Sequence, residues 1–205
     1  MMLIDLTRLT THGMPVYPGD APPQLVESVH FDEHQCVNHE FQGSMHVGTH
    51  MDGPMHMVKG GRKLCDMELD HFVGRGRLID ARGRVTLDVD LLDGKGVQAG
   101  DIVLFWTAWE EKFGDESYYG AFPVLTPALA EKLVEFQVKM IGLDSPSPDR
   151  EPYTVHRILL QKEILILENL VNLNALESKN FEVTALPAKW DADSAPTRVI
   201  AKLLA

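Results

Sequence analysis

The sequence contains few cysteines and no cluster of basic side chains, and each shortage argues against a class of protein. Cys36 and Cys65 are the two cysteines among 205 residues, and they lack the C-x-x-C spacing of redox and zinc sites. A disulfide scaffold and a cysteine-ligated zinc site are therefore not expected. The formal net charge is −11 and no run of Lys and Arg occurs, so a nucleic-acid partner is not expected either.

Long apolar runs are also missing. No stretch approaches the roughly 18 apolar residues of a membrane span, and the start of the chain lacks the pattern of a signal peptide. We therefore expect a cytoplasmic protein without a membrane partner. With 44% hydrophobic residues, the chain is long enough for one well-buried core and too short to favour two, which predicts a single domain over residues 1–205.

Short apolar segments of strand length recur along the chain. They predict strands at residues 2–7, 26–31, 37 into 45–56, 78–80, 102–107, 140–144, 164–170, 181–184 and 197–204. Thr126 and Pro127 are typical of a helix start, a capped helical turn is predicted at 154–160, and Gly74 and Gly76 are assigned to a turn. The pattern predicts an α/β domain, or an α+β domain, with a mixed β-sheet and few helices.

Imidazoles and a carboxylate are concentrated in residues 45–56, which read M-H-V-G-T-H-M-D-G-P-M-H. Neutral imidazole and carboxylate are the ligands that suit zinc and its first-row neighbours. In an extended backbone His46, His50, Asp52 and His56 have the same parity, so they start on one side of the strand. Any one of these histidines is readily explained as a surface residue on an edge strand, but the whole set of histidines with Asp52 favours a metal site.

The chain must bend for these ligands to meet one ion, because residues four apart on a straight strand lie about 13 Å apart at Cα. Gly48 is placed to allow a bend between His46 and His50. Pro54 fixes its own φ and turns the chain, which is expected to bring His56 back over the site.

Residues 46–56 fit H-x-G-T-H-x-D-x-P-x-H, and in this form they resemble the signature of the cyclase-like metal hydrolases. This family includes bacterial kynurenine formamidases and isatin hydrolases. The resemblance extends to P-x-Y-P-G-D at residues 15–20, G-x-D-x-x-S-x-D at 142–149, and H-x-x-L-L followed by I-x-I-x-E-N-L at 156–170. It implies the swivelling β/β/α fold of that family and a homodimer or a larger homo-oligomer.

The resemblance also implies a set of metal ligands. His46, His50 and Asp52 would hold one divalent ion, and Asp52 would bridge to a second ion held by His156 and Glu168. The implied cofactor is two zinc ions per subunit. Manganese, and a single ion as in isatin hydrolase, stay open as alternatives.

Two further residues receive roles from the resemblance. His56 is assigned as the general acid and base, because imidazole titrates nearest neutral pH, with metal ligation as its alternative role. Tyr17 would form an aromatic wall of the substrate site; the alternative is that it only packs its loop against the body.

Three functions are compatible with these observations. The first is a metal-dependent hydrolase that cleaves the C–N bond of a small N-formyl or cyclic aromatic amide, as kynurenine formamidases do. The second is a hydrolase or cyclase of another small carbonyl compound. The third is a non-catalytic protein stabilised by metal, which is disfavoured because structural zinc sites are closed by four ligands and usually rich in cysteine. A small-molecule substrate is the expected partner.

Overall fold

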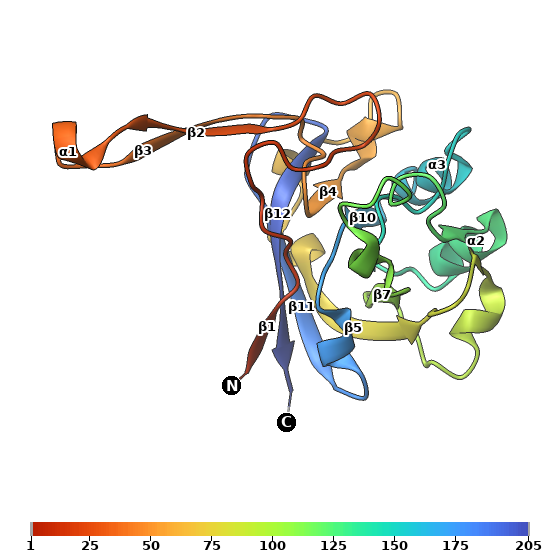
Figure 1. Cartoon of the computed structure of the whole chain (residues 1–205). Helices are drawn as coiled ribbons and strands as arrows, with labels where there is room; N and C mark the ends of the chain where they lie inside the picture. The colour runs from red at the N-terminus through yellow and green to blue at the C-terminus, as the bar shows by residue number, and fades with distance from the viewer. Residues whose placement is uncertain (1, 205) are drawn as a thin grey trace.

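A computed structural model describes residues 2–204, whose main feature is an 8-stranded mixed sheet (Figure 1). Its strands are β1 (Leu3–Asp5), β4 (His50–Asp52), β5 (Val73–Asp80), β7 (Ile102–Trp106), β9 (Met140–Leu143), β10 (Leu165–Glu168), β11 (Phe181–Pro187) and β12 (Ser194–Leu203). Their order is β1-β12-β11-β5-β7-β9-β10-β4, and β12 also pairs with β4, so the sheet closes on itself. β5, β7, β9 and β10 run parallel, whereas β4, β11 and β12 pair antiparallel to their neighbours. The predicted α/β class with a mixed sheet is confirmed.

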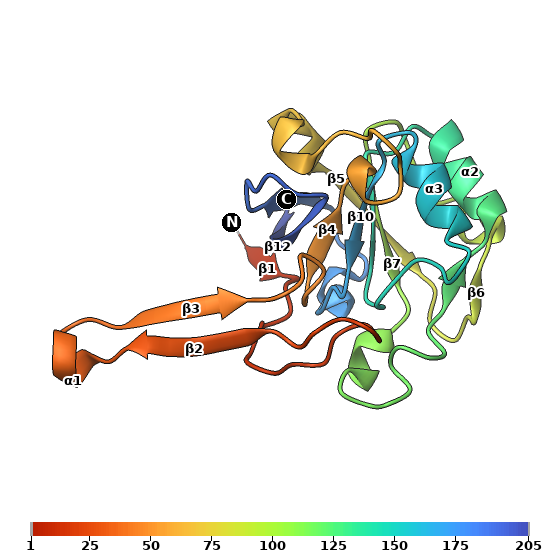
Figure 2. The ribbon, with the colours of Figure 1, turned by 90° about the horizontal axis from the view of Figure 1, so that it is seen from above.

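Helices are few, as predicted, and they are short. The α-helices are α1 (Phe31–His34), α2 (Pro127–Glu135) and α3 (Thr154–Leu160), and 3-10 turns occupy Pro54–His56, Leu64–Asp66, Leu69–Phe72, Val89–Leu92, Trp109–Lys112 and Leu173–Leu176. The Thr126 hydroxyl accepts a hydrogen bond from the Leu129 N–H at 3.1 Å, which confirms the predicted start of α2. Helices α2 and α3 lie side by side against one face of the sheet (Figure 2). Within residues 2–204, every helix is too short or too polar to cross a bilayer.

Strand β7 is buried on both faces, as its continuous apolar run predicted. Ile102 and Leu104 belong to the core enclosed by the curved sheet. Val103 and Phe105 belong to the second core, which lies between the sheet and helices α2 and α3. The alternation of side chains along one strand therefore joins the two cores.

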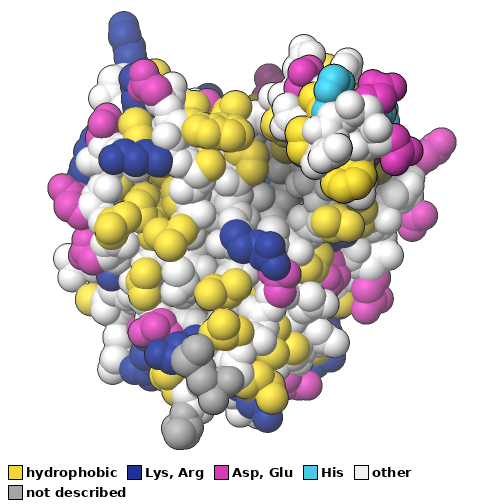
Figure 3. All heavy atoms as spheres, turned by 90° about the vertical axis from the view of Figure 1, so that its left-hand side faces the viewer, with side chains coloured by type: hydrophobic (Ala, Val, Ile, Leu, Met, Phe, Trp, Pro, Cys, Tyr) yellow, Lys and Arg dark blue, Asp and Glu magenta, His cyan; other side chains and the backbone are white. Residues whose placement is uncertain are grey.

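A two-stranded arm projects from the body (Figures 1 and 2). It consists of β2 (Gln24–Val29) and β3 (Asn38–Gln42) joined by α1, while β6 (Thr86–Leu87) and β8 (Val124–Leu125) form a separate short pair. Exposed apolar side chains of the arm are Val26, Phe31, Val37 and Phe41. Figure 3 views the molecule from the side on which the arm projects, with acidic, histidine and apolar side chains on the arm at the upper right.

Two predictions on local structure were wrong. The strand predicted from residue 37 through 45–56 is interrupted, because β3 ends at Gln42 and the chain turns before β4 begins at His50. Gly74 and Gly76 lie inside β5 and not in a turn. A Cβ at Gly76 would lie 1.9 Å from Cε2 of Phe181, so glycine is needed here for the close approach of β11.

This contact makes Gly76 sensitive to any side chain. Gly76→Ala should lower the free energy of unfolding by about 1–3 kcal/mol, because the buried Phe181 ring must move. Urea unfolding measures the change. The matched control is Gly120→Ala, whose added Cβ would meet its nearest atom, the Ser117 carbonyl oxygen, at 3.7 Å. Equal stability of the two variants would contradict the close approach of β11.

Candidate metal centre and active site

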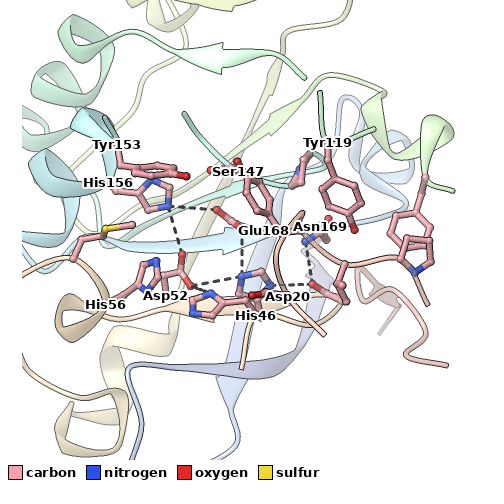
Figure 4. A pocket seen from close by; sticks show the side chains of 18 residues that line it. Asp20, His46, Asp52, His56, Tyr119, Ser147, Tyr153, His156, Glu168 and Asn169 are labelled. Carbon is pink, nitrogen blue, oxygen red and sulfur yellow. Dashed lines mark hydrogen bonds and ion pairs between the residues drawn. The ribbon is translucent and has the colours of Figure 1, made fainter. Parts of the chain in front are cut away.

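Strand pairing brings two carboxylates together at one end of the sheet. β4 pairs antiparallel with β10, in a register that sets His50 opposite Glu168 and Asp52 opposite Ile166. His50 and Asp52 are two residues apart on a short strand, so their side chains leave it on the same face, as their parity predicted. Helix α3 adds His156 to this cluster (Figure 4).

The two turns predicted in the motif are present. Gly48 has φ +60°, a left-handed conformation that favours glycine, and the bend here returns His46 to the cluster. His46 Nδ1 lies 3.0 Å from Asp52 Oδ1. The 3-10 turn at Pro54–His56 folds the chain back, so the rings of His56 and His46 have centroids 4.4 Å apart.

Asp52 lies at the centre of the cluster. Its Oδ1 faces His46 and lies 3.6 Å from His50 Nε2, whereas its Oδ2 lies 3.6 Å from His156 Nε2. Glu168 faces the same two rings, with Oε2 at 3.2 Å from His50 Nε2 and Oε1 at 3.5 Å from His156 Nε2. The five side chains predicted as ligands therefore converge, and their nitrogen and oxygen atoms lie on both sides of Asp52.

In His50 and His156, a hydrogen bond at Nδ1 leaves Nε2 as the nitrogen that faces the carboxylates. His50 Nδ1 lies 2.9 Å from the Gly48 carbonyl oxygen, and His156 Nδ1 lies 2.5 Å from Asp149 Oδ1. Both oxygens are acceptors, so each Nδ1 carries the proton and donates it. In a neutral ring, Nε2 then presents its lone pair to Asp52 and Glu168, which is the arrangement of a metal-binding histidine with its outer partner.

The chemistry of this donor set fits a divalent cation. Asp52 and Glu168 are 1% and 6% exposed, and two buried carboxylates require positive charge between or beside them. His50 Nε2 is buried and has no hydrogen-bond partner, although it points toward both carboxylates. A cation bound to this nitrogen and to the carboxylate oxygens would satisfy all of these groups.

The pKa shifts in the cluster also favour positive charge at its centre. Burial would raise the pKa of Asp52, but hydrogen bonds and charge from His156, His46 and His50 hold it well below its usual range. Burial would lower the pKa of His46, but the hydrogen bond and charge of Asp52 raise it to about 9. The pKa of His156 is also raised, because its contacts with Asp149, Asp52 and Glu168 outweigh burial. The cluster thus stabilises positive charge at its centre.

A cavity opens directly above this cluster and has aromatic walls (Figure 4). The aromatic residues that line it are Tyr17, Phe113, Tyr119 and Tyr153. Tyr17 comes from the loop at residues 15–20, and its ring lies edge-on to Tyr119 with centroids 5.9 Å apart. Burial and the neighbouring Tyr153 hydroxyl raise the pKa of Tyr17 to about 12, so it is neutral at pH 7. Tyr17 therefore lines the cavity, and its predicted role as a wall of the substrate site stays a prediction.

Two acidic residues of the site received no role from the sequence. Asp149 belongs to the segment at 142–149, and besides contacting His156 its Oδ2 accepts a hydrogen bond from the Val155 N–H at 2.6 Å at the start of α3. This contact satisfies one N–H group in the first turn of α3, whose N-cap residue, Tyr153, makes no side-chain cap hydrogen bond. Asp193, which contacts His46 and His56, lies far from every motif in the sequence.

The chain is similar to known proteins along almost its whole length. The sequence profile of the family described as putative cyclase matches residues 4–150. The kynurenine formamidase of Erythrobacter litoralis is 33% identical to this chain, over 98% of this chain and 93% of the relative.

Two solved structures share the fold over almost the whole chain. A potential metal-dependent hydrolase with cyclase activity is 26% identical, with a TM-score of 0.83 over 98% of this chain and 96% of the other. Isatin hydrolase A from Ralstonia solanacearum is 25% identical, with a TM-score of 0.87 over 98% of this chain and 91% of the other. The resemblance noted in the sequence is thereby confirmed, and the chain belongs to the putative cyclase family.

Proposed function

We propose that this protein is a metal-dependent hydrolase that cleaves the C–N bond of a small aromatic N-formyl or cyclic amide. The observation that carries the proposal is the buried, unpaired Nε2 of His50, which faces Asp52 and Glu168 at the floor of an aromatic cavity. The relatives support the same reaction class, because one is named kynurenine formamidase and a structural neighbour is named isatin hydrolase. The chain is therefore an enzyme, and the non-catalytic alternative is not retained.

The positions of the donor atoms support two metal sites that share Asp52. Oδ1 of Asp52 faces His46 and His50, which would hold one ion, whereas Oδ2 faces His156, which with Glu168 would hold the other. We propose zinc for both sites; manganese is the alternative metal, and a single ion is the alternative number. When bound, such ions lower the pKa of water toward about 7 and polarise a carbonyl group.

The side chains of this protein supply the remaining steps. His56 lines the cavity beside the cluster, where it would accept a proton from the attacking water and return it to the leaving nitrogen. The rings of Tyr17, Phe113 and Tyr119 offer apolar surface to a flat, aromatic ligand and limit the access of bulk water. Because His56 would protonate the leaving nitrogen, the amine would leave as a neutral molecule.

The proposed reaction includes two substrate classes, the N-formyl amides and the cyclic aromatic amides such as isatin. The cyclic class is favoured by the fold similarity to isatin hydrolase A, whereas the N-formyl class is favoured by the curated relatives.

A homodimer and a cytoplasmic location also stay predictions. An isolated hairpin is marginally stable in water, so the exposed arm of β2 and β3 is compatible with packing against another subunit.

A substrate panel tests the proposed reaction. Metal-loaded protein should hydrolyse N-formylkynurenine, and metal-stripped protein should not, because the cluster would then lack its cation. Isatin and simple lactams are the comparison substrates, and absorbance spectroscopy measures each turnover. Hydrolysis of isatin alone would favour the cyclic aromatic amides over the N-formyl class. Failure on every amide in the panel would contradict the function.

Removal of any ligand should remove metal and activity together. Elemental analysis of the wild type should approach about two ions per chain, and His156→Ala or Glu168→Ala should leave about one. His46→Ala and His50→Ala should each lose metal, with the largest loss in Asp52→Ala because this residue lies between both groups.

The matched control for these variants is His39→Ala, which removes an exposed imidazole from β3 on the arm. It should keep both its metal content and its activity. Unchanged metal content in all of the ligand variants would reject the site.

His56 is expected to behave differently from the ligands. His56→Ala should retain metal while kcat falls by about 10²–10⁴-fold, the range for loss of a general acid or base. The loss should be smaller on a phenyl ester than on the matching anilide, because phenolate leaves with less need of a proton. Steady-state kinetics on the two substrates measures the difference. Equal impairment, or loss of an ion, would indicate that His56 serves the metal.

A further inference from the structure

We propose that Asp193 is the positioning residue of His56, which it orients for proton transfer. This inference rests on the proposed function, because it assigns a partner to the proton-transfer residue of that reaction. Asp193 Oδ2 lies 3.0 Å from His56 Nδ1 and 3.2 Å from His46 Nε2. The residue lies outside the segment at 4–150 that matches the family profile, and it contacts both imidazoles from the side of the C-terminal strand.

The backbone holds Asp193 firmly in this place. It immediately precedes β12, whose first residue, Ser194, pairs with Asp52 in β4. The Gly53 N–H donates a hydrogen bond to the Asp193 carbonyl oxygen at 3.1 Å, and a Cβ at Gly53 would lie 2.9 Å from that oxygen. The glycine after Asp52 therefore permits the approach of the Asp193 backbone.

A serine hydroxyl connects this carboxylate to the centre of the site. Ser194 Oγ lies 3.1 Å from Asp52 Oδ1 and 3.2 Å from Asp193 Oδ2, so it can donate its proton to either carboxylate. Ser194 is 1% exposed, which leaves its hydroxyl few other partners. The position of Asp193 is thus coupled to that of Asp52.

The contact with Asp193 determines the tautomer of His56. A carboxylate can only accept, so His56 Nδ1 must carry the proton that it donates to Asp193. Nε2 is then the nitrogen left to exchange protons with water and the leaving group. His56 lines the cavity, whereas Asp193 is not among the described residues that line it. Asp193 therefore acts through His56 and does not touch the substrate.

The same carboxylate also supports His46. With His46 Nε2 donating to Asp193, His46 Nδ1 is left to face Asp52, which repeats the arrangement of His50 with Gly48 and of His156 with Asp149. Asp193 differs from those two outer acceptors because it contacts two rings, that of the proposed ligand His46 and that of His56. Loss of Asp193 could therefore weaken metal binding as well as proton transfer, and saturating metal in the assay separates the two effects.

A double-mutant cycle tests the inference. At saturating zinc, Asp193→Asn should keep the metal content and KM of the wild type but lower kcat on an anilide by about 10–100-fold, the usual cost of losing an outer partner. The loss should be smaller on the matching phenyl ester, as it is for His56→Ala. The double variant His56→Ala/Asp193→Asn should be no slower than His56→Ala, because the carboxylate then has no proton-transfer ring to orient, and saturating zinc compensates for its lost contact with His46.

The matched control is Asp191→Asn, two residues away on the same turn. Asp191 is exposed and pairs with Lys63, so kcat should stay at the wild-type value on both substrates. Additive losses in the double variant, equal losses on the ester and the anilide, or loss of metal at saturation would each overturn the role of Asp193. If His56→Ala shows no loss, the proposed role of His56 fails first, and the inference fails with it.

Discussion

The close approach of two buried carboxylates, Asp52 and Glu168, is the constraint on which the rest of the site depends. They lie on neighbouring antiparallel strands, and both are almost completely removed from water. Such a pair is strongly unfavourable unless positive charge lies next to it. A divalent cation would meet this need, and His50 and His156 are oriented to hold it, since each ring faces both carboxylates with one nitrogen and has its other nitrogen bonded to an outer acceptor. The energetic demand of the carboxylates thus explains both the donor set and its orientation.

The closure of the sheet makes this arrangement rigid. β4 contains three residues and would be a poor edge strand alone, but it is hydrogen-bonded to β10 on one side and to β12 on the other. Asp52 is therefore held opposite Ile166 and Ser194 at once. Because β12 also pairs with β11 and β1, the C-terminal segment connects the site to the opposite end of the sheet. Residues far apart in the sequence thereby share one rigid support, as a metal site of fixed geometry requires.

The part of the site that could be predicted is the part that neighbouring residues in the sequence determine. The parity of His50 and Asp52, the bend at Gly48 and the turn at Pro54 all follow from backbone rules within eleven residues, and the structure contains each of them. Asp193 lies 137 residues from its partner His56, and only the pairing of β12 with β4 brings the two together. Gly76 was misassigned for the same reason, since the Phe181 ring that requires a glycine there belongs to a distant strand. Long-range contacts of this kind leave no periodic pattern in the sequence.

The buried carboxylates and the aromatic walls of the cavity come from different parts of the fold. Asp52 and Glu168 project from strands whose positions the sheet determines, so these two carboxylates are tightly constrained. Tyr17, Phe113 and Tyr119 instead come from connections between strands, where changes of length and sequence are tolerated. A change in these loops would reshape the cavity without moving the carboxylates. Members of one family can therefore keep the same pair of buried carboxylates and act on different amides, because the strands fix the carboxylates and the loop residues select the ligand.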